Sequence, residues 1–165
     1  MTGLVYRALP AGTLYLTPDA VRQMLSHRQF GVRSREAGGV LLGRHLKDVA
    51  DIVVDKVTEP KLGDRRGWGS FFRSFRHNIS ARRRWAKHDH TSAYLGSWHT
   101  HPEPDPRPSA VDIADWQSAL GRDTYEGARL FFVIVGTKQL RVWQGGRIGD
   151  LNELGFIREH NEKSN

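Results

Sequence analysis

The chain has 165 residues, 38% of them hydrophobic, which suits one compact domain around one core. It has no cysteine, which excludes disulfides, thiolate metal ligands and a cysteine-protease mechanism. Any metal site must therefore use histidine and carboxylate ligands. No apolar run approaches the ~20 residues that span a membrane, and the N-terminus lacks a charged and then apolar leader, so we expect a cytoplasmic protein.

The formal net charge is +7, and much of the excess lies between Arg65 and Lys87. A solvated basic face, whose arginine stems cover apolar surface, explains such a cluster. Recognition of a nucleic acid or of an acidic protein surface is the functional alternative. We favour the solvated face over nucleic-acid binding.

The N-terminal part is predicted to contain one strand and one helix. Residues 1–12 carry little pattern and are expected to form a loose lead-in, and Thr13–Thr17 reads as a short strand. Thr17-Pro18-Asp19 then supplies a helix N-cap, a proline at the first helical position and an early acid. We expect an amphipathic helix from Pro18 to about Gln29, with a core-facing stripe of Val21, Met24 and Leu25.

Two strands are predicted next, at Glu36–Gly43 and at Val49–Val57, paired as a hairpin. Paired glycines in the first strand let another backbone or a ligand approach closely. We expect the edge of Gly38–Gly43 to suit an extended substrate peptide. Taken alone, Glu36 reads as an exposed carboxylate at a strand edge.

Two less regular segments follow. Glu59–Ser70 contains proline and several glycines and is predicted to be a surface loop. Phe71–His88 is predicted to be a basic amphipathic helix. His88-Asp89-His90 lies at its end, and no carboxylate follows at a fitting spacing, so we assign this pair of histidines no metal.

The stretch from Gly96 to Pro102 carries the chemistry. Tyr94–Thr100 reads as a strand, and residues two apart on a strand point to the same face. His99 and His101 can therefore present two imidazoles to one point, while Trp98 faces the other side. The proline-rich continuation cannot extend a ladder or begin a helix before Pro108.

A helix is predicted from Ser109 to Leu120, with Ser109 as its N-cap and Asp112 in its first turn. Ser-x-x-Asp is also a capping-box variant, and a lone His-x-His is common by chance. Their order and spacing together do not follow from capping. Two imidazoles and one carboxylate leave a tetrahedral zinc with an open fourth position, which is the mark of a catalytic site. The expected packing residues of the helix are Val111, Ala114, Trp116 and Leu120.

The chain ends in a predicted antiparallel hairpin of Ala128–Val135 and Gln139–Trp143. Gly145-Gly146 is expected to turn, Leu151–Ile157 to pack back, and His160–Asn165 to form a polar tail. The whole order predicts an α+β fold in one domain over residues 1–165, with helices flanking a mixed, largely antiparallel sheet.

The motif resembles that of the JAMM (MPN-plus) metallopeptidases, which remove ubiquitin-like proteins from their conjugates. The family pattern is an upstream glutamate, then His-x-His-Pro, six residues and Ser-x-x-Asp, and the chain matches it from His99 to Asp112. Arg35–Gly43 is similar to the glutamate-bearing strand opening. The resemblance covers about residues 14–143 and implies the cytidine deaminase-like fold of MPN domains.

The resemblance also implies roles for single residues. His99, His101 and Asp112 would hold Zn²⁺, Glu36 would be the acid and base, and Ser109 would support the oxyanion. The implied function is a zinc isopeptidase that cleaves after the C-terminal tail of a ubiquitin-like protein. The chain is most similar to short stand-alone prokaryotic members. Some of these undo conjugation to a nucleotidyltransferase in anti-phage operons.

Two alternatives from other classes stay open. The chain could be a catalytically silent MPN scaffold, although such members typically lack metal ligands that are present here. It could also be a basic nucleic-acid-binding protein whose metal is structural, in which case its affinity for nucleic acid would depend steeply on salt.

Overall fold

The computed structural model describes residues 2–31, 34–60, 65–66, 71–72, 92–148 and 150–160. Its helices are α1 (Pro18–Leu25) and α3 (Ala110–Arg122). Its strands are β1 (Gly3–Arg7), β2 (Thr13–Leu16), β3 (Gly38–His45), β4 (Ile52–Val57), β5 (Arg65–Arg66), β6 (Phe71–Phe72), β7 (Ala93–Thr100), β8 (Arg129–Val135), β9 (Leu140–Gly146), β10 (Asn152–Glu153) and β11 (Phe156–His160).

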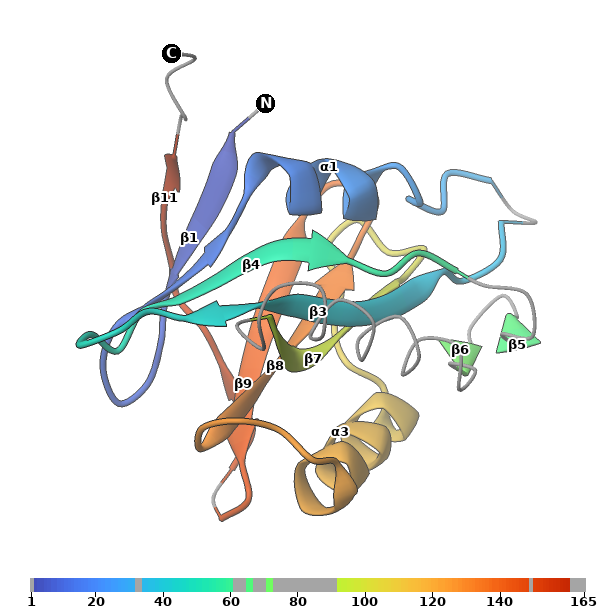
Figure 1. Cartoon of the computed structure of the whole chain (residues 1–165). Coiled ribbons are helices and arrows are strands. Elements are labelled where there is room, and N and C mark those ends of the chain that lie inside the picture. The colour runs from blue at the N-terminus through green and yellow to red at the C-terminus, as the bar shows by residue number, and fades with distance from the viewer. Residues whose placement is uncertain are drawn as a thin grey trace.

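Nine of these strands form one sheet in the order β10-β9-β8-β7-β3-β4-β2-β1-β11, while β5 and β6 pair with each other. The sheet is strongly curved, and α1 and α3 lie on different sides of it (Figure 1). Among the strand pairs that the structure describes, only β2–β4 and β7–β8 are parallel. The mixed, largely antiparallel α+β fold is therefore as predicted, including the β3–β4 and β8–β9 hairpins.

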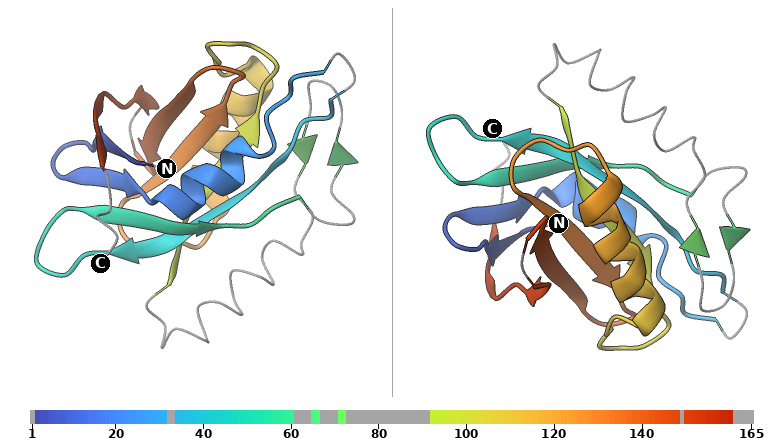
Figure 2. Two further views of the ribbon diagram at one scale, coloured as in Figure 1. Left: turned by 90° about the horizontal axis from the view of Figure 1, so that it is seen from above. Right: turned by 90° about the horizontal axis from the view of Figure 1, so that it is seen from below.

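The strand β8 separates two hydrophobic cores, because its side chains alternate between the faces of the sheet. Phe131 and Val133 belong to a cluster that includes Met24 of α1 and Trp98 of β7. Phe132 and Ile134 belong to a second cluster that includes Trp116 and Leu120 of α3. Each helix thus covers one face of the same central strands, as the two views in Figure 2 show.

The parallel β7–β8 pair places α3 in the fold. Two parallel strands in one sheet need a crossover connection, usually a helix. Here the crossover runs from the end of β7 through residues 101–109 into α3 and back to β8. The start of α3 therefore lies near the carboxyl end of β7, where His99 and His101 are.

Glycines allow the central strands to come close together. A side chain on Gly39 would place its Cβ 2.0 Å from the Thr58 carbonyl oxygen, and one on Gly43 would place it 1.8 Å from that of Val53. The expected close approach of another backbone is confirmed. The expected free edge is wrong, because Gly38–Gly43 pairs with β7 along its length and Leu41–His45 pairs with β4.

Several local expectations are corrected. Residues 1–12, which were expected to form a loose lead-in, contain the strand β1. This strand is held by pairing with β2 and with the distant β11, so the local sequence pattern did not predict it. Arg65–Arg66 forms the strand β5, where a loop was expected, and Phe71–Phe72 forms β6, where a helix was expected to begin. The rest of the expected helix, and His88 and His90 at its end, lie outside the described residues. The helix α1 ends at Leu25 and not near Gln29. The strand β9 continues through Gly145 and Gly146.

Two expected packing residues of α3 are exposed. Val111 is 58% exposed and Ala114 is also exposed, whereas Trp116 and Leu120 are buried as predicted. Among the described residues, no helix has the length and apolar character that crossing a membrane requires.

Candidate metal centre

The strand β7 brings the two histidines together. His99 pairs in register with Gly38 of β3 and Ile134 of β8, and the His101 amide donates to the Val135 carbonyl at 3.0 Å. The extended path therefore holds through His101, and both side chains point to one face. Their Nε2 atoms are 3.1 Å apart, and the two residues are only 8% and 9% exposed.

The first turn of α3 adds a carboxylate to this pair. Asp112 places Oδ1 3.1 Å from His99 Nε2 and Oδ2 3.4 Å from His101 Nε2. Ser109 orients it through a capping box: the Ser109 amide and hydroxyl donate to Asp112 Oδ2 at 2.6 and 2.7 Å, and the Asp112 amide donates to Ser109 Oγ at 3.2 Å. The capping box of α3 thus includes Asp112, the candidate metal ligand.

Glu36 is the fourth member of the cluster. Its Oε1 is 3.7 Å from the Nε2 atoms of both His99 and His101. The residue is 2% exposed, so its interpretation as an exposed strand-edge carboxylate is wrong. Burial, reinforced by the carboxylates of Asp112 and Glu103 and opposed by His101, raises the pKa of Glu36 to about 7 in the absence of a metal.

Glu103 contacts the cluster, although the sequence did not point to it. Its carboxylate lies 3.0 Å from His101 Nδ1. Because a carboxylate only accepts, Nδ1 must carry the proton, which leaves the Nε2 lone pair directed at the cluster. The signal was present as a glutamate two residues after the second histidine, on a loop whose path could not be predicted from spacing.

The donor set fits a metal ion. The four residues each offer one ligand atom, and all four atoms lie within 4.8 Å of one another. For ligands at about 2.0–2.1 Å from a tetrahedral zinc, neighbouring ligand atoms are about 3.3–3.4 Å apart. The two imidazole Nε2 atoms are 3.1 Å apart. Asp112 comes within 3.1 Å of His99 through Oδ1 and within 3.4 Å of His101 through Oδ2, whereas Glu36 Oε1 is 3.7 Å from both imidazoles. This pattern suits three ligands and one neighbouring carboxylate.

Charges in the metal-free cluster are strongly coupled. Burial alone would raise the pKa of Asp112, yet hydrogen bonds with His101 and His99 hold it far below its ordinary value. Burial alone would lower the pKa of His101, yet its hydrogen bond to Asp112 and the nearby carboxylates raise it. The cluster therefore favours a positive charge at its centre, which a divalent cation can supply.

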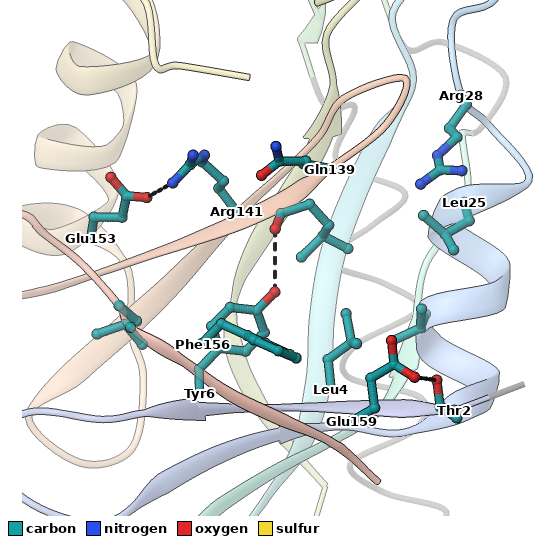
Figure 3. Close-up of a pocket in the computed structure, with 14 residues that line it drawn as sticks. Thr2, Leu4, Tyr6, Leu25, Arg28, Gln139, Arg141, Glu153, Phe156 and Glu159 are labelled. Carbon is teal, nitrogen blue, oxygen red and sulfur yellow. Dashed lines mark hydrogen bonds and ion pairs between the residues drawn. The ribbon is translucent and has the colours of Figure 1, made fainter. Parts of the chain in front are cut away.

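A cavity near α1 lies away from the cluster. A cavity of about 740 Å³ lies between α1 and the strands β1, β9 and β11, with Leu4, Leu25 and Phe156 on its apolar wall and Arg28 at its rim (Figure 3). None of the four cluster residues lines it. The candidate chemistry is thus in the crossover region and not in this cavity.

Comparison with known proteins agrees with the fold and the cluster. Residues 18–145 match the family of prokaryotic homologues of the JAB domain, and the chain belongs to this family. A Vibrio cholerae protein named CD-NTase/cGAS isopeptidase is 33% identical over 79% of this chain and 80% of its own length. An Escherichia coli protein of the same name is 31% identical over 82% of this chain and 83% of its own.

A solved structure supports the fold alone. The solution structure of protein DSY2949 from Desulfitobacterium hafniense matches with a TM-score of 0.62 and 23% identity, and the match covers 90% of this chain and 94% of that one. The α+β architecture predicted from the sequence is therefore that of a known fold.

Proposed function

We propose that this protein is a zinc-dependent isopeptidase that cleaves the bond after the C-terminal tail of a ubiquitin-like protein or its conjugate. The convergence of His99, His101 and Asp112, with the buried carboxylate of Glu36 beside them, is the observation that carries the proposal. The name shared by the relatives supports a CD-NTase as the conjugated partner, and hence a role in anti-phage defence.

His99, His101 and Asp112 would hold the zinc. When bound, zinc polarises the scissile carbonyl and lowers the pKa of a water molecule from ~15.7 toward ~7. The chain contributes a nearly dry site and ligands whose orientation is set in advance by Glu103 and Ser109.

Glu36 would act first as base and then as acid. It takes a proton from the attacking water and delivers it to the leaving lysine amine as the C–N bond breaks, so protons balance over the cycle. The 3.7 Å from its Oε1 to Nε2 of both imidazoles supports a role beside the proposed ligands and not as one of them.

Ser109 would donate a hydrogen bond to the oxyanion. Its single hydroxyl proton points to Asp112 Oδ2 in this structure, so this role requires the O–H bond to rotate when substrate is bound. Losing one such donor typically costs about 3–4 kcal/mol in the transition state.

The test uses the C-terminal tail of a ubiquitin-like protein joined through an isopeptide bond to a lysine in a peptide from a CD-NTase. The wild-type protein should release the lysine, and Glu36→Gln should keep zinc and substrate binding but lose turnover, because the amide has the size of the acid without its basicity. Near-normal cleavage by a zinc-loaded Glu36→Gln protein would contradict the mechanism. A zinc-loaded wild type that binds but never cleaves would instead indicate a silent scaffold.

A further inference from the structure

A buried chain of hydrogen bonds links Gln29, which follows α1, to the residue beside Glu36. The Thr100 hydroxyl accepts from the Ala37 amide at 2.9 Å and donates to Gln29 Oε1 at 2.9 Å. The Thr100 amide also donates to the Ala37 carbonyl at 2.8 Å. Thr100, which lies between the two histidines, therefore holds the backbone next to Glu36 by both its amide and its side chain.

Gln29 completes this chain and orients it. Its Nε2 donates to the Ser34 carbonyl at 3.0 Å, and the residue is only 3% exposed. A flipped amide would point an oxygen at the Ser34 carbonyl, so the partners determine its orientation. Gln29 thereby contacts both ends of the segment Ser34–Ala37: directly at Ser34, and through Thr100 at Ala37.

Because these groups are buried, breaking one of their hydrogen bonds is costly. Thr100 and Ala37 are each 0% exposed, so water is not available to replace a lost partner. A buried glutamine carries four hydrogen-bonding capacities and is expensive to enclose unless they are used. Hydrophobic packing alone would favour an apolar residue at position 29.

We propose that Gln29 and Thr100 are positioning residues that together hold Glu36 at its distance from His99 and His101. The expected effect on kcat rests on the proposed function. The expected effect on the backbone at Ala37 does not. Neither residue offers a ligand to the metal cluster. They act through the backbone at Ala37, and we expect the proposed ligands at the end of β7 and in the first turn of α3 to keep their places in the variants.

The chain offers a matched control. The Thr58 hydroxyl accepts from the Val40 amide at 2.9 Å, and Thr58 is 7% exposed. Thr100→Val and Thr58→Val thus each remove a buried hydroxyl from a backbone amide near the start of β3. The Thr58 bond lies three residues farther along the chain, at Val40 and not at Ala37. Gln29→Met keeps the length of the side chain, and Thr100→Ser keeps the hydroxyl.

The first measurement is amide hydrogen exchange in the zinc-loaded protein. Gln29→Met and Thr100→Val should speed exchange at Ala37 about tenfold and leave Val40 unchanged, whereas Thr58→Val should do the reverse. Zinc affinity, measured by competition with a chelator, should stay within about threefold of wild type in all variants. Unchanged exchange at Ala37 in Gln29→Met would overturn the proposal whether or not the protein is a peptidase.

The second measurement is steady-state cleavage of the isopeptide substrate. Gln29→Met and Thr100→Val should lower kcat about 10- to 100-fold with KM within about threefold, while Thr100→Ser and Thr58→Val stay near wild type. Equal kcat in Gln29→Met and Thr58→Val would overturn the kinetic part. If the wild type cleaves nothing, the proposed function fails, and the exchange data still decide whether the two residues position Glu36.

Discussion

Glu36 is buried, so its ionised form is destabilised relative to its neutral form. It is 2% exposed, and the carboxylates of Asp112 and Glu103 add to the effect of burial on its pKa. Such a group favours its neutral form until a cation arrives. The same environment that suits a proton carrier beside a metal therefore destabilises the metal-free protein at high pH.

The pH dependence of stability follows from this pKa. Glu36 shifts from 4.5 to about 7 on folding, so the protonated form favours the fold; its contribution is complete below pH 4.5 and is lost as pH rises through 7. At about 1.4 kcal/mol per unit, Glu36 should cost the metal-free protein about 3 kcal/mol between pH 4.5 and pH 8. Urea unfolding of wild type and Glu36→Gln at both pH values measures the difference. Parallel pH profiles would show that Glu36 is not shifted.

Ser109 caps α3 and also orients Asp112. The N-cap of α1, Thr17, serves as a control that separates these two roles. Ser109→Ala and Thr17→Ala each remove an N-cap, from α3 and α1 respectively, and each should cost about 1 kcal/mol in unfolding free energy. Only Ser109 also orients Asp112, so only Ser109→Ala should weaken zinc binding, by about 10- to 100-fold. Chelator competition measures this, and equal zinc affinities would mean that Ser109 is a cap alone.

At the scale of elements, sequence pattern predicted those parts whose cause is local. The N-caps at Thr17 and Ser109 and the two histidines on one strand face depend on residues within a few positions of each other. The burial of Glu36 and the contact of Glu103 with His101 depend on tertiary packing, which spacing does not encode. The members of the cluster on β7 and α3, and the cap at Ser109, could therefore be named from the sequence, while the contact of Glu103 with His101 could not.

The connector from His101 to Ser109 is held to the β8–β9 turn. The Thr137 amide donates to the Glu103 carbonyl and the Gln139 amide donates to the Pro104 carbonyl, both at 2.9 Å. Arg141 adds a two-pronged ion pair to Asp105. The distance between the histidines on β7 and the aspartate on α3 thus depends on a loop that is fixed at several points.

A glycine in that turn should control the metal site from a distance. In Gly136→Ala the new Cβ would lie 2.6 Å from the Glu103 carbonyl oxygen and 2.7 Å from Pro106 Cδ, which forces the connector to move. Such overpacking costs about 1–3 kcal/mol, and we expect zinc affinity to fall about tenfold. Gly121→Ala is the control, since its Cβ would meet no atom within 4 Å, and it should bind zinc normally. Equal affinities would mean that the connector adapts freely.

At the scale of the molecule, the fold closes through contacts that are very distant in sequence. The strand β1 pairs with β11 from Gly3–His160 onward, so these two strands lie side by side (Figure 1). Gln144 also bonds the Leu9 backbone, and Tyr6 the Leu140 carbonyl. A short segment such as Gly3–Arg7 has a weak local pattern, so its pairing could not be predicted from the sequence alone.

Metal binding should stabilise this whole fold, because its ligands come from segments that unfold together. We expect one equivalent of zinc per chain, and at a free zinc concentration of 100 Kd a stabilisation of about 2.7 kcal/mol. Chelation should therefore lower Tm by about 5–10 °C. His99→Ala and His101→Ala should lose this response, whereas His45→Ala should keep it, because His45 on β3 lies outside the cluster. Metal analysis with thermal unfolding measures both quantities, and a His99→Ala/His101→Ala protein that still holds one equivalent of zinc would place the metal elsewhere.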